Sequence, residues 1–188
     1  MEVPSGGIHP DVEEVLIDAG SIARRVAELG AQIGRDYAGR PLHLVGVLKG
    51  AVPFLADLLR ALPVPEVTMD LLGISSYGRS TETSGVVRFT KDLDEPVAGR
   101  HVLIVEDIVD TGLTLRYLRE QIGARDPSSL AAVAMVDKPG RRAVGVPVEY
   151  TGFVIPDRFA VGYGLDCAGR YRHLPYVGAL RPEAARRQ

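Results

Sequence analysis

Cysteine is nearly absent from the 188-residue chain, which has Cys167 alone. One cysteine cannot form a disulfide within the chain, and this usage is typical of proteins from a reducing compartment. Histidine is also scarce. The four histidines, His9, His43, His101 and His173, lack the spacing of metal ligands, so we predict no histidine metal site.

The chain also lacks an excess of positive charge, because 22 Lys and Arg stand against 24 Asp and Glu, a formal net charge of -2. Nucleic acid is therefore not an expected partner. No apolar run approaches the length of about 18 residues that a membrane helix needs, and the first residues lack the pattern of a signal peptide. These absences predict a cytoplasmic protein with no membrane partner.

What is present favours a single α/β domain over residues 1–188. Hydrophobic residues make up 46% of the chain, and a chain of this length can bury a full core. Apolar runs suited to buried strands alternate with helical patterns, which predicts a central parallel sheet flanked by helices. We expect strands over residues 43–48, 66–74, 86–90, 102–105, 130–136, 148–155 and 176–180.

Helices are expected in three places. From Asp11, a plausible N-cap, apolar residues step by three and four as far as Ile33, which predicts one amphipathic helix. A second helix begins near Pro53, and a third runs from Leu115 to a stop at Gly123. Residues 181–188 are expected to form a polar tail.

The residues from Val102 to Thr114 read VLIVEDIVDTGLT and carry the strongest chemical pattern in the chain. Four apolar residues predict a buried strand that stops at Glu106 and Asp107. A loop of small residues follows, and then the helix. The predicted order is strand, acidic turn, loop and helix.

Each part of this stretch suggests a ligand group. Adjacent carboxylates at a strand end can accept hydrogen bonds from a diol or hold a magnesium-bound ligand. A Thr-Gly-x-Thr loop that opens a helix presents backbone N–H groups, hydroxyls and the positive end of the helix dipole to a phosphate. Together they outline a ribose 5-phosphate. An acidic turn followed by an ordinary threonine N-cap is the alternative.

This stretch resembles the signature of the type I phosphoribosyltransferases, which bind 5-phosphoribosyl 1-diphosphate (PRPP), and the whole chain resembles their hypoxanthine-guanine branch. The resemblance implies the type I phosphoribosyltransferase fold, in which a small hood built from N- and C-terminal segments covers a central parallel sheet flanked by helices. It implies that Glu106 and Asp107 bind the ribose hydroxyls. The loop that cups the 5-phosphate would comprise Asp110, Thr111, Gly112, Leu113 and Thr114. Ile108 and Val109, which precede it, are also expected to bind substrate. Leu113 stands where many relatives have a polar residue.

Three further residues are expected around the pyrophosphate. Lys49 and Gly50 follow a buried strand, and a lysine there points into the crevice where ligands of open α/β sheets bind. They resemble the family's pyrophosphate loop, in which the Leu48–Lys49 peptide would be cis. Arg172 matches a family arginine, and its guanidinium suits bidentate pyrophosphate binding. Taken alone, Lys49 and Arg172 could equally be solvated side chains.

Residues 75–85 contain one aromatic and no aliphatic side chain, so we expect a long loop there. A plain solvated hairpin connection is the alternative. The resemblance implies a catalytic loop in which Ser76 and Tyr77 close over the active site and exclude water.

The purine would lie among four residues near the C-terminus. The resemblance implies that Lys138 reads a 6-oxo group and that Phe159 stacks on the base; by residue type alone, a solvated lysine and a core phenylalanine are the alternatives. It also places the backbone of Ala160 and Asp166 at the edge of the base. Ala160 replaces the family's usual valine.

The resemblance implies transfer of the phosphoribosyl group from PRPP to hypoxanthine or guanine, with Mg²⁺ held by Glu106, Asp107 and Asp166, and Asp110 as the base. The chain would be a homodimer or homotetramer. A PRPP-binding regulatory protein, a xanthine-preferring enzyme and a pyrimidine enzyme are the alternatives. The regulator would need a basic face that the chain lacks, and Lys138 and Phe159 conflict with a pyrimidine.

Overall fold

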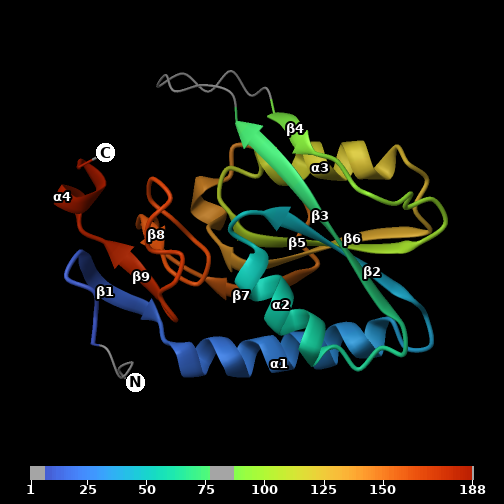
Figure 1. Ribbon diagram of the computed structural model, residues 1–188, viewed down its shortest axis with the longest axis horizontal. Helices are drawn as coiled ribbons and strands as arrows, with labels where there is room; N and C mark the ends of the chain where they lie inside the picture. The colour runs from blue at the N-terminus through green and yellow to red at the C-terminus, as the bar shows by residue number, and fades with distance from the viewer. Residues whose placement is uncertain (1–6, 77–86, 188) are drawn as a thin grey trace.

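The computed structural model describes residues 7–76 and 87–187 and consists of a six-stranded sheet between two layers of helices, with a small hood at one end (Figure 1). The strand order is β4-β3-β2-β5-β6-β7, and all neighbours are parallel except the edge strand β4, which is antiparallel to β3. The strands are β2 (Leu42–Leu48), β3 (Val67–Ser76), β4 (Val87–Lys91), β5 (His101–Val109), β6 (Ser129–Asp137) and β7 (Tyr150–Val154).

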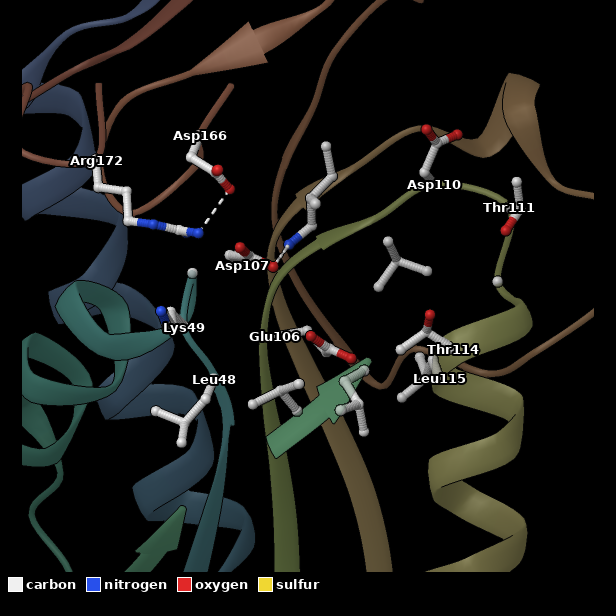
Figure 2. A pocket seen from close by; sticks show the side chains of 16 residues that line it. Leu48, Lys49, Glu106, Asp107, Asp110, Thr111, Thr114, Leu115, Asp166 and Arg172 are labelled. Atoms are coloured by element: carbon white, nitrogen blue, oxygen red, sulfur yellow. Dashed lines mark hydrogen bonds and ion pairs between the residues drawn. The ribbon is translucent and has the colours of Figure 1, made fainter. Parts of the chain in front are cut away.

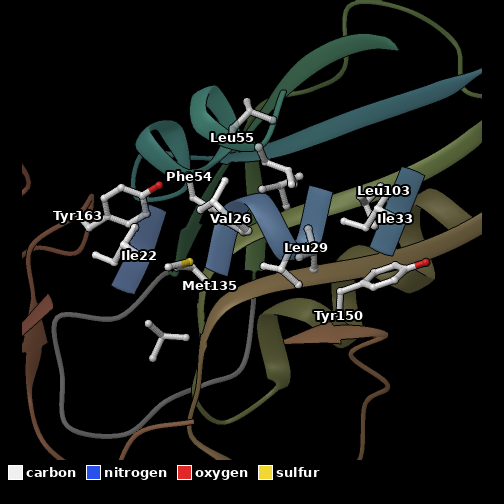
Figure 3. Packing of buried hydrophobic residues seen from close by; sticks show 14 of the residues in the cluster. Ile22, Val26, Leu29, Ile33, Phe54, Leu55, Leu103, Met135, Tyr150 and Tyr163 are labelled. Carbon is white, nitrogen blue, oxygen red and sulfur yellow. The ribbon is translucent and has the colours of Figure 1, made fainter. Parts of the chain in front are cut away.

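Alternate residues of the central strands face opposite helical layers. On one side, α1 (Ala19–Asp36) and α2 (Val52–Ala61) pack against a cluster that includes Leu103 of β5 and Met135 of β6 (Figure 3). On the other side, α3 (Leu113–Gly123) packs Leu115, Leu118 and Ile122 against the opposite face of the same strands. Because β2, β5 and β6 are covered on both faces, their sequences are nearly continuous apolar runs. The predicted parallel sheet is confirmed.

The N-terminal helix predicted from Asp11 is partly wrong. Residues Val12–Ile17 form strand β1, and the helix begins only at Ala19. Asp18, not Asp11, is its N-cap, with a carboxylate that accepts a 2.8 Å hydrogen bond from the Ser21 N–H. Apolar residues at 12, 15 and 16 fit helical spacing, but their strand partners lie at the other end of the chain and could not be seen locally.

Those partners form the hood. Strand β1 pairs antiparallel with β9 (Val177–Leu180), which in turn pairs with β8 (Ala160–Val161). The predicted hood of N- and C-terminal segments is therefore confirmed. The polar tail expected after residue 180 instead includes a short helix, α4 (Pro182–Ala185), whose Ala184 is buried against the hood.

The acidic turn predicted after Val105 is also wrong. Strand β5 continues to Val109, and Glu106 and Ile108 pair with Ala134 and Val136 of β6. The side chains of Glu106 and Asp107 therefore project from an extended strand, whose regular backbone points them to opposite faces of the sheet. No helix in the part of the chain that the structure describes is long and apolar enough to cross a bilayer.

Candidate active site

A cavity of about 420 Å³ opens at the carboxyl ends of β2 and β5, beneath the hood (Figure 2). This is the edge at which open parallel sheets bind ligands. It brings together most of the residues predicted from the sequence. They are Lys49, Gly50, Glu106, Asp107, Ile108, Val109, Asp110, Thr111, Gly112, Thr114, Asp166 and Arg172.

Glu106 and Asp107 lie at the centre of this cavity. Burial raises the pKa of Glu106 well above its ordinary value, and the neighbouring Asp107 carboxylate raises it further. Burial also raises the pKa of Asp107 to about 6, against hydrogen bonds from backbone N–H groups that lower it. The raised pKa values mean that ionisation of these two carboxylates is unfavourable in this cavity. A bound cation, or hydroxyl groups that donate hydrogen bonds to them, would stabilise the ionised form.

The predicted phosphate loop lies at the start of α3. Gly112 is the N-cap residue, with a φ of +83° in the left-handed region, so the alternative of a threonine N-cap is wrong. The first backbone N–H groups of α3 have no earlier turn to bond, and Thr111 and Thr114 line the cavity beside them. The loop can therefore bind a phosphate in the manner expected.

The segment that contains Ala143, Val144 and Val146 packs against this loop. The Thr111 carbonyl accepts hydrogen bonds from the N–H groups of Ala143 and Val144, at 2.9 and 3.3 Å. A Cβ at Gly112 would meet the Val146 side chain at 3.0 Å. Leu113 is not among the described residues that line the cavity, in keeping with a loop that acts through its backbone.

The predicted pyrophosphate loop enters from the other side of the cavity. The Leu48–Lys49 peptide is cis, as expected. Gly50 is buried against Asp107, and a Cβ on it would lie 1.5 Å from the Asp107 Oδ2 atom. Only glycine therefore lets the loop approach the acidic pair, which the sequence motif alone did not reveal.

Arg172 reaches the cavity from the hood. Its guanidinium forms an ion pair with Asp166 at 2.7 Å (Figure 2). It also donates a 2.7 Å hydrogen bond to the Gly164 carbonyl. These contacts place the guanidinium near Asp107, where its positive charge lowers the pKa of that carboxyl against the larger effect of burial.

A smaller cavity of about 220 Å³ adjoins the first and contains the predicted purine residues. It shares Asp107, Ile108, Asp110 and Asp166 with the larger cavity and adds Lys138, Phe159 and Ala160. Phe159 is 50% exposed, so the alternative of a core phenylalanine is wrong. Lys138 is only 6% exposed and donates to the Arg158 carbonyl at 2.5 Å, so it is not a solvated lysine.

Two arginines beside Asp110 were missed by the sequence analysis. Arg141 donates from Nε to the Asp110 carboxylate at 3.1 Å, and Arg142 donates to the Val109 and Asp110 carbonyls at 2.8 and 2.6 Å. Adjacent arginines close behind Lys138 were the signal available. The catalytic-loop prediction stays open, since Tyr77 is outside the described residues and only the backbone of Ser76 is described, in β3.

The donors present fit a magnesium ion that arrives with its substrate. No group of three or more His, Cys, Asp or Glu among residues 7–76 and 87–187 forms a complete metal site. Asp107 and Asp166 are nevertheless close enough for the charge of Asp166 to raise the pKa of Asp107. Mg²⁺ is commonly held by one or two carboxylates together with substrate phosphates.

Comparison with known proteins defines the class. The model of the phosphoribosyl transferase domain family matches residues 14–167. The chain belongs to this family, as the motif from Val102 to Thr114 predicted. Within the family, the chain is similar to enzymes named for hypoxanthine and guanine.

The hypoxanthine phosphoribosyltransferase of Salmonella typhimurium is 53% identical over 169 residues, which cover 89% of this chain and 94% of that protein. The hypoxanthine-guanine phosphoribosyltransferase of Bacillus subtilis is 48% identical over 172 residues, 92% of this chain and 95% of that protein. A crystal structure of a hypoxanthine phosphoribosyltransferase from Staphylococcus aureus, 43% identical, matches with a TM-score of 0.91 and covers 97% of this chain and 98% of that chain.

Another relative is much longer. The bifunctional protein TilS/HprT of Listeria innocua is 47% identical over 176 residues, which cover 94% of this chain and 27% of that protein. The chain therefore spans about a quarter of the length of that relative.

Proposed function

We propose that this chain acts in purine salvage, transferring the phosphoribosyl group of PRPP to the 9-nitrogen of hypoxanthine or guanine and releasing pyrophosphate. The observation that carries the proposal is the pair of adjoining cavities. The larger has donors and acceptors for a ribose, a phosphate and a pyrophosphate, and the smaller has a lysine and an exposed aromatic ring for a base.

The larger cavity would hold PRPP by both ends. The start of α3 receives the 5-phosphate, and Glu106 and Asp107 accept hydrogen bonds from the ribose hydroxyls. Lys49 and Arg172 bind the pyrophosphate and stabilise the charge that builds on it as the glycosidic bond breaks. Because PRPP would be held at both ends, its anomeric carbon would face the smaller cavity, in which the base would bind.

Mg²⁺ is the cofactor we propose, held by Asp107 and Asp166 with Glu106 behind them. When bound, it would supply positive charge that neutralises the leaving pyrophosphate. Bound cation also favours the ionised carboxylates, whose pKa values burial raises in its absence.

The smaller cavity favours a 6-oxopurine. The Lys138 ammonium can donate but not accept hydrogen bonds, so it suits the 6-oxo group of hypoxanthine or guanine and disfavours the 6-amino group of adenine. Phe159 presents a half-exposed ring for stacking, and Ala160 and Asp166 lie at the edge of the same cavity.

Asp110 is the proposed general base, because it lines both cavities and so lies between the ribose and the purine. It would take the proton at the 7-nitrogen of the base. It is not the helix N-cap, since Gly112 occupies that position.

Asp110→Asn should cut the single-turnover rate of nucleotide formation by about 100-fold, the lower end of general-base effects, while PRPP affinity stays within a few fold. Quenched-flow rates and PRPP binding by calorimetry measure the two quantities. A collapse of PRPP binding would make Asp110 a binding residue instead.

Substrate screening tests the function as a whole. Pyrophosphate release from PRPP should occur with hypoxanthine or guanine and not with adenine, uracil or orotate, each supplied singly with Mg²⁺. Release with xanthine alone would favour a xanthine enzyme, and PRPP binding without release would favour a regulatory protein.

We also propose a cytoplasmic location and assembly as a homodimer or homotetramer. The single, buried cysteine supports a reducing compartment. Light scattering of the purified protein distinguishes monomer, dimer and tetramer directly.

A further inference from the structure

Arg141 connects two segments that border the purine cavity. It lies in the short 3-10 helix Pro139–Arg141 that follows Lys138. Its Nε donates to Asp110 Oδ1 at 3.1 Å, and its Nη1 lies 3.6 Å from Asp157 Oδ2. Asp110 belongs to the loop between β5 and α3 (Figure 2), and Asp157 lies two residues before Phe159.

Arg141 and Arg142 hold different parts of Asp110. Arg142 donates to the Asp110 carbonyl and so fixes its backbone, whereas Arg141 holds one oxygen of its carboxylate. A carboxylate held by one oxygen has a restricted rotation, and its second oxygen can still accept a hydrogen bond or a proton. The two contacts together fix the direction of the proposed base.

Fold stability does not account for the Arg141 contacts. The side chains of Arg141, Asp110 and Asp157 are 48%, 39% and 64% exposed. Exposed ion pairs of this kind contribute little to stability. An exposed arginine that connects two segments bordering a ligand cavity is therefore better explained by a role in positioning those segments.

We propose that Arg141 is a positioning residue for the transfer reaction, orienting the Asp110 carboxylate towards the purine and holding, through Asp157, the segment that carries Phe159. It touches neither sugar nor base. It acts through Asp110 on the rate of bond formation and through Asp157 on the affinity for the base. This role rests on the proposed function and adds a residue to it.

The test compares Arg141→Gln, Arg141→Lys and Asp157→Asn with the wild-type enzyme. Arg141→Gln should lower the single-turnover rate about ten-fold and raise the KM for hypoxanthine a few fold, with the KM for PRPP within two-fold. Arg141→Lys keeps one donor for Asp110 and should recover most of the rate. Asp157→Asn should raise only the KM for hypoxanthine.

Arg125→Gln is the matched control, because Arg125 forms a comparable ion pair with Asp92 away from both cavities. Its rates should equal those of the wild type. Melting temperatures of all variants should agree within a few degrees.

Two results would overturn the proposal: an Arg141→Gln variant with unchanged single-turnover rate and base KM, or one whose only defect is in the KM for PRPP. Wild-type turnover is measured first, because it tests the proposed function separately from the role of Arg141. If the wild type transfers to no base, the proposed function and the role of Arg141 fall together. If it is active and Arg141→Gln is equally active, only the role of Arg141 is lost.

Discussion

Asp107 should destabilise the ligand-free protein at neutral pH, and Asp107→Asn should remove that effect. Burial raises the pKa of this carboxyl from 3.8 to about 6 in the folded state. As pH rises from 4 to 6, the unfolded chain therefore loses the Asp107 proton before the folded protein does. The free energy of unfolding falls across this window, because the folded state binds more protons than the unfolded state.

The magnitude follows from the size of the shift. A difference of roughly two pKa units corresponds to about 3 kcal/mol at pH 7, at 1.36 kcal/mol per unit, and screening by solvent makes this an upper bound. Asparagine is neutral and keeps an oxygen that can accept the 2.8 Å hydrogen bond from the Ile108 N–H. The variant should therefore be more stable than the wild type above pH 6 and about equal to it at pH 4.

Thermal melts of the metal-free and ligand-free proteins between pH 4 and 8 measure the difference. A domain of this size gains roughly 2–4 °C per kcal/mol, so several degrees are expected at pH 7.5. Glu120→Gln, a change at an exposed helix position, serves as the control and should show no such trend. Equal or lower melting temperatures for Asp107→Asn at pH 7.5 would refute the reasoning.

Two further substitutions separate binding from stability. Phe159→Ala should raise the KM for hypoxanthine roughly 5- to 160-fold, since stacking of a base on an aromatic ring contributes about 1–3 kcal/mol. The melting temperature should stay unchanged because Phe159 is half exposed, and a lower melting temperature with normal KM would contradict this. Tyr163→Phe removes the 2.7 Å hydrogen bond to Asp57 of α2 and should lower the melting temperature by several degrees, since a hydrogen bond to a charged group contributes roughly 1.5–3 kcal/mol. Its kcat should stay within two-fold, and an unchanged melting temperature would argue against the bond.

The sheet could be predicted because its signals are local. The buried strands β2, β5 and β6 are continuous apolar runs, and the helices after them carry their own periodicity. The start of the chain could not be predicted in this way. Val12–Ile17 is a strand because β9 pairs with it, and nothing in the neighbouring residues encodes a partner so far along the chain.

In the site too, the residues of a contiguous motif could be predicted from the sequence, whereas contacts between distant segments could not. The motif from Glu106 to Thr114 is contiguous, so its chemistry could be inferred before its geometry was known. Arg141 acquires its importance only when three strand ends meet, because one of its partners precedes it by 31 residues and the other follows in a separate segment. The need for glycine at position 50 likewise appears only when the Asp107 side chain is in place.

The pairing of β1 with β9 has a consequence for how the protein is made. β9 is the middle strand of the hood, so a nascent chain that has released β1 must wait until residues 177–180 leave the ribosome before the two can join. At roughly 5–20 residues per second, that delay lasts on the order of ten seconds or more. Until then the larger sheet can assemble, but the segment bearing Asp166 and Arg172 has no scaffold, so the proposed active site is incomplete.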